Sequence, residues 1–465
     1  MTINFSNLPL AFPKKMTPSR NLLLLVLVII FQTAVSKPFK DWLVSRIDTK
    51  SSFSKTPKGT VVLSNGLIQR EFLLHPNLAT IDLYSYEKKS SVIRALGPET
   101  VIELDGVVFN VGGVVSSNFR AYMNRSEQNF QNDENAFQLV SHKTRAPEVD
   151  FPYAPQRGAP KDISWPPKGL GVDFLFKAPP NASPEHQLVE VMVSYEIYDG
   201  MPLMSKWVTV YKRGGDENVV KVRFLDVETL YVNQQWSPVT FDSRSALTNF
   251  GWLFVETDRA HGTEVVWDKD GSEADDWGSF EPYFNCTYSP QVSITVTKRG
   301  IKSFKVHELL IGSSDAERAA LSRHRMFRLL APHTQENPIF FHMTNSSPSA
   351  VRNVIDQMAE VGFEMLIYSF GSGFHIESTN ETYIAEVKAV IDYAHARGIE
   401  VGGYDLISLT RTTPNASWMA VDVNGKSIGS ACFASHWYDQ LLERFLYFIN
   451  KTGPFLDYEF MTKVH

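Results

Sequence analysis

Residues 338–460 alternate short apolar segments with amphipathic ones, and this alternation constrains the fold more than any other feature. The apolar segments are PIFFHM, EMLIYSFG, IEVGGYDLIS and FLDYEF, and the stretches between them carry apolar residues at helical spacing. Strands that alternate with helices indicate βαβ units, whose strands are parallel. The sequence therefore predicts four parallel strands separated by three helices.

Each predicted helix has residues that start and stop helices. Serine and asparagine are good N-caps, proline fits the first helical position, and glycine ends a helix in the left-handed conformation. The start and stop residues are, in order, Ser347 and Gly362, Asn380 and Gly398, and Ser435 and Gly453. The strands between the helices are apolar throughout, as expected when helices cover a parallel sheet.

Upstream of this region, from Gly59 to Gly312, the apolar period changes to two. Asn65-Gly66, Asp105-Gly106 and Asp199-Gly200 each stand between two alternating runs. These dipeptides favour the type I′ turn of a hairpin, because both of its central residues need a positive φ. The pattern predicts a large antiparallel β-domain of two stacked sheets.

Two inserts interrupt this β-domain. Residues 145–182 are rich in proline, which cannot donate to a strand ladder, so we expect a long loop there. Residues 268–277 (DKDGSEADDW) are acidic, but their glycine is misplaced for a calcium-binding EF-hand loop. We interpret the acidic stretch as a solvated turn and expect neither a metal site nor a cofactor in this protein.

The 465 residues divide into five parts, and several domains are expected for a chain of this length. We expect a signal peptide at 1–36, a linker or edge segment at 37–58, a β-sandwich at 59–312, a helical linker at 313–337 and the βα region at 338–465.

The N-terminus is typical of a secretory signal. Lys14, Lys15 and Arg20 precede the apolar run Leu22 to Phe31, and the small residues of 34–36 (AVS) fit a cleavage site. The apolar run is shorter than the about 20 residues of a transmembrane helix, so we expect no stable membrane span after cleavage. A secreted or lysosomal protein is the prediction, and an uncleaved signal anchor is the alternative.

Glycosylation sequons support this compartment. Seven N-x-S/T sequons behind a signal peptide predict a glycoprotein that carries its glycans on the surface. The acceptor residues are Asn124, Asn181, Asn285, Asn345, Asn380, Asn415 and Asn450.

Composition excludes several classes of protein. The net charge of −6 argues against the basic surface that binds nucleic acid. Two cysteines, Cys286 and Cys432, exclude a disulfide-framework scaffold and a cysteine-based zinc cluster. Whether these two cysteines pair with each other is left open by their spacing.

Candidate site residues follow from their position at the ends of the predicted strands. Ligands and catalytic groups gather where parallel strands end. Tyr404 and Asp405 end the third strand, and Asp457 and Glu459 project to the same side of the fourth. Glycoside hydrolysis needs two carboxylates about 5–10 Å apart, which Asp405 and Glu459 could supply. The alternative is that Asp405 caps a loop and Glu459 is an exposed terminal residue.

Several segments resemble one family of enzymes. AEVKAVIDYAHARGIEVGGYDL, at 385–406, is similar to the helix and third strand of α-galactosidase-like (β/α)8 glycoside hydrolases. RLLAPHTQENPIFFH, at 328–342, resembles the entry to their aldolase-type TIM barrel. SNGLIQREF and YEIYDGMPLMSKW, at 64–72 and 195–207, resemble the β-supersandwich that precedes the barrel in the family 36 branch.

The resemblance implies a retaining α-glycosidase that uses carboxylates and no cofactor. It places the nucleophile at the end of the fourth strand, where Glu459 stands, and the acid/base after a sixth strand. Asp405 would line the sugar subsite with Glu459. The substrate-binding candidates are His375, Tyr404, Trp437 and Asp457, although a lone histidine or tryptophan in such a place also serves packing.

Two hypotheses about function follow. The first is a secreted, α-galactosidase-like hydrolase acting on α-linked sugars, represented by an incomplete chain with the first half of the barrel and inactive alone. The second is a non-catalytic secreted protein that binds carbohydrate through its β-domain. A truncated gene product and a genuine short product are both considered for this chain.

Overall fold

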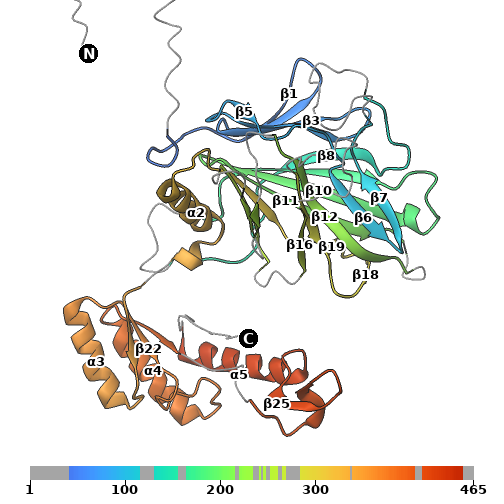
Figure 1. Cartoon of the computed structure of the whole chain (residues 1–465). Helices are drawn as coiled ribbons and strands as arrows, with labels where there is room; N and C mark the ends of the chain where they lie inside the picture. The colour runs from blue at the N-terminus through green and yellow to red at the C-terminus, as the bar shows by residue number, and fades with distance from the viewer. Residues whose placement is uncertain are drawn as a thin grey trace, which may run out of the picture. The chain divides into compact units, whose positions relative to one another are not determined.

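A computed structural model describes most of the chain between residues 41 and 453 (Figure 1). The described residues are 41–115, 130–155, 164–214, 219–233, 240–241, 245–247, 252–259, 264–268, 283–335, 338–403 and 411–453. They form two compact units, one of Met1–Tyr153 with Asp162–Pro332 and one of Ala154–Lys161 with His333–His465. Each unit is considered by itself.

The first unit contains three sheets of antiparallel strands (Figure 1). The five-stranded sheet has the order β1 (Ser52–Lys55), β2 (Val61–Ser64), β3 (Ile68–Leu73), β4 (Ala79–Ser85), β5 (Ser90–Ser91). The six-stranded sheet has the order β16 (Val265–Asp268), β17 (Tyr283–Tyr288), β12 (Lys221–Tyr231), β6 (Thr100–Leu104), β7 (Val107–Val111), with β18 (Ile294–Thr295) beside β12. The nine-stranded sheet has the order β13 (Thr240–Phe241), β14 (Ser245–Leu247), β15 (Leu253–Thr257), β20 (Val306–Leu310), β11 (Leu203–Lys212), β10 (Val189–Tyr198), β9 (Gly169–Lys177), β8 (Gln138–Arg145), with β19 (Ile301–Lys302) beside β11.

One apolar core joins these sheets. Phe72 of β3 lies 5.2 Å, between ring centroids, from both Phe174 of β9 and Tyr195 of β10, and all three rings are buried. Ile102 and Leu225 bring the six-stranded sheet into the same core. The predicted β-sandwich is confirmed, although its strands are divided among three sheets. Period-two patterning marks strands but does not show which distant strands pair.

The three predicted hairpins form, but only one has the expected turn. Asp105 and Gly106 both have positive φ, 48° and 84°, as the type I′ turn requires. At the other two turns only Gly66 and Gly200 have positive φ. Those connections are longer than two residues, so the strands close without a type I′ turn. Asn65 instead donates its side-chain amide to the carbonyl oxygens of Tyr198 and Met201, each at 2.6 Å.

The segment before β1 packs on α2 (Ala316–Leu330), and both belong to the first unit. Arg318 donates two hydrogen bonds to the carboxylate of Asp41, at 2.6 and 2.7 Å. Trp42 is buried beside Met326 of the helix. Residues 37–58, interpreted as a linker or an edge segment, contain β1, which forms the edge of its sheet. The helix α2, interpreted as part of a linker, contributes to a hydrophobic core.

One face of the nine-stranded sheet packs in the apolar core, and the opposite face carries charged side chains around Trp207. Trp207 alternates along β11 with the core residue Val208, yet it is only 1% exposed. The cationic groups of Arg145, Lys302 and Lys305 lie 4.5–5.0 Å from its ring centroid. Glu148 and Asp150, at the start of the proline-rich insert, pair with Lys302 and Lys305. The beginning of the predicted loop is therefore bound along this face.

His307 lies on the same face of β20. Its Nδ1 shares a 2.7 Å hydrogen bond with the hydroxyl of Ser205, which shares another with Tyr198. Burial, reinforced by the positive charge of Lys305, lowers the pKa of His307 to about 3. The imidazole is therefore neutral in the folded protein at ordinary pH.

The second unit contains a three-stranded parallel sheet, β21 (Phe340–Met343), β22 (Met365–Tyr368), β23 (Glu400–Gly403). α3 (Pro348–Val361) and α4 (Glu381–His395) follow the first two strands, and α5 (His436–Thr452) follows the third after a connection with η5 (Ala416–Trp418) and a hairpin, β24 (Met419–Val421) and β25 (Ser427–Ala431). The three helices lie where the sequence predicts them. The fourth predicted strand lies outside the described residues, and the hairpin was not predicted.

α5 departs from a regular βα repeat, in which successive helices run in the same direction with their first turns together. Tyr447 and Lys451, near the end of α5, bind Glu381 in the first turn of α4. Arg444 lies 3.7 Å from Glu377, just before α4. The C-terminal half of α5 therefore lies beside the start of α4. Helical periodicity identifies the buried face of a helix but not its direction.

We predict that His307→Gln reduces the acid sensitivity of the first unit. The folded-state pKa of about 3 lies below the unfolded value of 6.5. The contribution of the neutral imidazole to the free energy of unfolding is thus fully present above pH 6.5. This contribution falls by up to about 1.4 kcal/mol per pH unit as the pH falls toward 3. Urea unfolding of both proteins at pH 7 and pH 4.5 measures the difference; equal losses of unfolding free energy would contradict it.

Candidate functional site

Polar groups meet at the carboxyl end of the parallel sheet in the second unit. His342 of β21 is in register with Ile367 of β22 and Gly402 of β23, so these residues share one face of the sheet. Leu366 and Val401, one residue earlier, pack in the core on the other face. The Nδ1 of the exposed His342 lies 2.9 Å from the hydroxyl of Ser369, the first residue after β22.

The loop after β22 is fixed by aromatic contacts. Phe374 stacks on Tyr368 with ring centroids 4.6 Å apart and planes within 7°. The hydroxyl of Tyr383 in α4 accepts a hydrogen bond from the backbone N–H of His375 at 2.9 Å. Burial raises the pKa of the Tyr368 hydroxyl, so this ring serves as a neutral packing surface. These contacts anchor the loop to the core of the second unit.

Glu377 connects this loop to the segment that follows β23. Its carboxylate forms an ion pair with Arg411 and lies 3.7 Å from Arg444 of α5. Arg411 also accepts a backbone hydrogen bond from the N–H of Ala431 in β25, at 2.6 Å. Three segments that are distant in sequence therefore meet around one carboxylate. Its pairing with two arginines suits a structural role better than that of a free nucleophile.

Four of the predicted site residues, Tyr404, Asp405, Asp457 and Glu459, lie outside the described residues. β23 ends at Gly403, so Asp405 comes two residues after the strand in the sequence.

The two predicted residues that the structure describes differ in their surroundings. His375 is exposed in the loop after β22. Trp437 is half-buried at the start of α5, where it packs against the core and against Phe433, with ring centroids 5.8 Å apart. Packing, the alternative noted for Trp437, is therefore what this arrangement supports.

The sequence analysis missed Ser369 and the ion pairs of Glu377. Ser369 lies inside the segment EMLIYSFG that the sequence predicts as a strand, whereas β22 ends at Tyr368, so the predicted strand end came too late to single this residue out. Nothing in the sequence indicates that Arg411 and Arg444 reach Glu377, because the contact depends on how two loops and α5 fold together.

Most of the described sequon asparagines are exposed. These are Asn181, Asn345, Asn380, Asn415 and Asn450. Asn285 is different: it is 6% exposed in β17, and its side-chain amide donates to the hydroxyl of Thr229 at 2.9 Å. A glycan on Asn285 does not fit this fold, which corrects that expectation. Asn124 lies outside the described residues.

Both cysteines are free thiols. Cys286 is buried in β17, and Cys432 is half-buried in the second unit. Burial raises the pKa of the Cys286 thiol well above its usual range, so it behaves as a small apolar residue.

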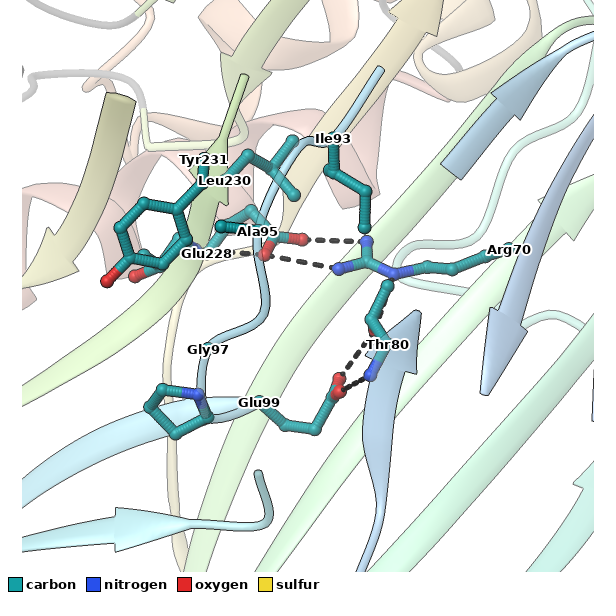
Figure 2. A pocket seen from close by; sticks show the side chains of 11 residues that line it. Arg70, Thr80, Ile93, Ala95, Gly97, Glu99, Glu228, Leu230 and Tyr231 are labelled. Atoms are coloured by element: carbon teal, nitrogen blue, oxygen red, sulfur yellow. Dashed lines mark hydrogen bonds and ion pairs between the residues drawn. The ribbon is translucent and has the colours of Figure 1, made fainter. Parts of the chain in front are cut away.

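A buried polar network lies inside the first unit beside a small cavity (Figure 2). Arg70 of β3 donates to Glu228 of β12 at 2.8 Å and to Glu308 of β20 at 3.2 Å. Lys206 of β11 donates to Glu228 at 3.0 Å, and Arg70 donates from Nε to the hydroxyl of Thr80 at 3.0 Å. The charged side chains are at most 1% exposed.

The charges of this network stabilise one another. Although burial opposes it, Arg70 and Lys206 lower the pKa of Glu228. Burial and the negative charge of Glu228 raise the pKa of Glu308 well above its usual range. The cavity has a volume of about 10 Å³, room for about one water molecule. A paired and enclosed network of this kind stabilises the fold and has no room for a substrate.

Two further properties concern the described part of the chain. It contains no helix with the length and apolar character needed to span a bilayer. Within the same residues, no group of three or more histidine, cysteine, aspartate or glutamate side chains is placed to hold a metal ion.

Comparisons with known proteins give structural matches only. No family model matches the sequence, and no curated protein matches it either. The solved structures that are similar include the galactosidase domain of an α-galactosidase–sucrose kinase, AgaSK (TM-score 0.49, 11% identity, 87% of this chain and 66% of that one). The GH36 α-galactosidase AgaB of Geobacillus stearothermophilus matches with TM-score 0.49 and 10% identity, over 86% of this chain and 64% of that one. An α-galactosidase of Lactobacillus brevis matches with TM-score 0.49 and 8% identity, over 87% and 62%. The chain thus spans slightly less than two thirds of these proteins, and similarity at this level does not determine function.

We predict that Arg70→Ala destabilises the first unit by about 3–5 kcal/mol, because it leaves the buried Glu228 with one cation instead of two. The matched control is Arg46→Ala, which removes an ion pair with Asp48 whose side chains are 90% and 78% exposed. The control should change the unfolding free energy by less than about 1 kcal/mol. Urea unfolding followed by tryptophan fluorescence measures both; similar small effects for the two variants would show that the network contributes little.

Proposed function

We propose that this chain forms part of a retaining, α-galactosidase-like glycoside hydrolase that acts on α-linked sugars. The observation that carries the proposal is the parallel sheet of the second unit. β23 ends two residues before Asp405 in the sequence and lies beside β22, and His342 of β21 meets Ser369 at this end of the sheet. Catalytic groups of enzymes with parallel βα repeats lie at this end of the strands. The sequence resemblance to α-galactosidase-like enzymes supplies the reaction type.

The proposed reaction uses two carboxyl groups. A carboxylate attacks the anomeric carbon while a carboxylic acid protonates the departing glycosidic oxygen, which gives a covalent glycosyl–enzyme and a free alcohol. The second group then deprotonates a water molecule, which hydrolyses the covalent ester and releases the sugar. We assign the nucleophile to Glu459 and a place in the sugar subsite to Asp405, with Tyr404 and Asp457 as further sugar contacts.

The acid/base group is assigned to no residue of this chain. A (β/α)8 site is assembled from the loops that follow eight strands, and the described sheet contains three. His342, Ser369 and His375 can donate or accept hydrogen bonds with sugar hydroxyls. Within the described part of the chain, no contact of these three side chains supports the role of the acid that protonates the leaving group.

A glycosyl fluoride tests this assignment, because fluoride leaves without protonation. The expected inactivity of the chain alone concerns ordinary glycosides, whose cleavage needs the acid. We expect the chain without residues 1–36 to release fluoride from α-galactosyl fluoride, Glu459→Gln to abolish the release, and Val423→Ala, at an exposed hairpin tip, to leave it unchanged. Hydrolysis of an unactivated aryl α-galactoside should be at background. Efficient hydrolysis of the aryl galactoside would refute the location of the acid. Sugar binding with no fluoride release would instead support the non-catalytic alternative.

We also propose that the protein enters the secretory pathway, with a signal peptide at residues 1–36. The exposed sequon asparagines are accessible to glycosylation. Expression in a eukaryotic cell should give a product that loses mass on treatment with peptide N-glycosidase, with Asn285 unmodified. A cytosolic product without glycans would count against the secretory compartment. A glycan on Asn285 would count against the buried position of this residue in the fold.

A further inference from the structure

A surface groove in the second unit lies between η5 and the outward face of α5. Its volume is about 680 Å³, within the range of small-molecule sites. Trp418 forms one side. The other is formed by side chains of α5, which are His436, Asp439, Gln440, Leu442, Glu443 and Leu446. Of the described residues at the strand ends, His342, Ser369 and His375 do not contribute to the groove.

The local fold explains why these residues face one another. The carbonyl oxygen of Trp418 accepts hydrogen bonds from the N–H of Cys432 at 2.7 Å and from the hydroxyl of Ser435 at 3.4 Å. Ser435 caps α5, so η5 is fastened to the start of this helix. Leu441 and Phe445 bury the inner face of α5, which leaves its polar side toward the groove.

The polar side chains of the groove follow helical spacing. Glu443 follows Asp439 by four positions and Gln440 by three, so its side chain neighbours both of them on the surface of α5. Asp439 interacts with His436, whose Nδ1 lies 3.1 Å from its carboxylate. Gln440 and Glu443 are exposed. Their planar amide and carboxylate groups can each bind two neighbouring hydroxyls of a ligand.

These groups match the chemistry of a neutral pyranose. A sugar ring presents an apolar face of C–H groups, which packs on a flat aromatic ring, and a rim of hydroxyls, which bind carboxylates and amides. Trp418 supplies the aromatic surface, Leu442 and Leu446 extend it, and Gln440 with Glu443 faces the rim. The carboxylates would repel an acidic sugar. Among the described residues the lining contains no lysine or arginine, and its histidine, His436, lies beside Asp439.

We propose that this groove is a second, non-catalytic binding site for a neutral pyranose unit of an oligosaccharide. The proposal rests on the proposed function only for the choice of sugar. It implies that the protein holds its substrate at a point on the surface as well as at the ends of the parallel strands.

The test observes Trp418 directly. Protein without residues 1–36 is made in bacteria with 5-fluorotryptophan, so that no glycan on the nearby Asn415 competes for the groove. The chain has nine tryptophans, and the 19F resonance of Trp418 is the one missing in Trp418→Phe. We expect raffinose to shift this resonance saturably. The double variant Gln440→Ala, Glu443→Ala should weaken the binding at least tenfold, and both positions are exposed on a helix that tolerates alanine.

The matched control is Val423→Ala, at an exposed position outside the groove, which should bind as the unaltered protein does. A shift of the Trp437 resonance with none of Trp418 would overturn the groove proposal and leave the proposed function standing. Equal affinity in the double variant would also overturn it. A response of Trp418 to a basic amphipathic peptide but to no sugar would assign the groove to a protein partner and overturn it as well.

Discussion

The buried ion network of the first unit is the interaction on which the β-domain depends. Arg70 comes from the five-stranded sheet, Glu228 from the six-stranded sheet, and Glu308 and Lys206 from the nine-stranded sheet. A buried charge is costly unless it is paired, so any slip of one sheet relative to another would leave a charge unpaired inside the core. Apolar packing holds the sheets together, and this network restricts their relative placement to one arrangement.

In the second unit the corresponding constraint is the parallel sheet. Parallel strands gather their following loops at one end, which brings residues that are far apart in the sequence to a common edge. His342 and Ser369 meet there, and the loops beyond β22 and β23 are joined by Glu377 and Arg411. The loops that follow these strands therefore meet at one edge of the sheet, and the roles of Glu459 as nucleophile and of Asp405 in a sugar subsite are proposals for residues outside the described part of the chain.

The departures from expectation have a common cause. The α5 helix begins and ends where its capping residues predict, and contacts such as that between Tyr447 and Glu381 show that its C-terminal half lies beside the start of α4. Asn285 carries a sequon, but its position in the middle of a sheet buries the amide that a glycan would need. Two of the three glycine hairpins use turns other than the expected type because their connections are longer. In each case the outcome depends on neighbours in space or on the length of a connection, which the local sequence signals do not contain.

The sequence by itself determined the element types: the period-two runs of the β-domain, the helices between Ser347 and Gly453, and the short apolar strands at 340, 365 and 400. These follow from the spacing of apolar residues and from capping residues, which act within a few positions of the chain. It also predicted where a site should lie, because strand ends can be read from the pattern. Only the tertiary structure decided that Arg70 meets Glu228 and Glu308, that Arg411 and Arg444 share Glu377, and that Trp418 faces α5. Such contacts join segments far apart in the chain, and their free energy depends on burial and geometry that no local pattern contains.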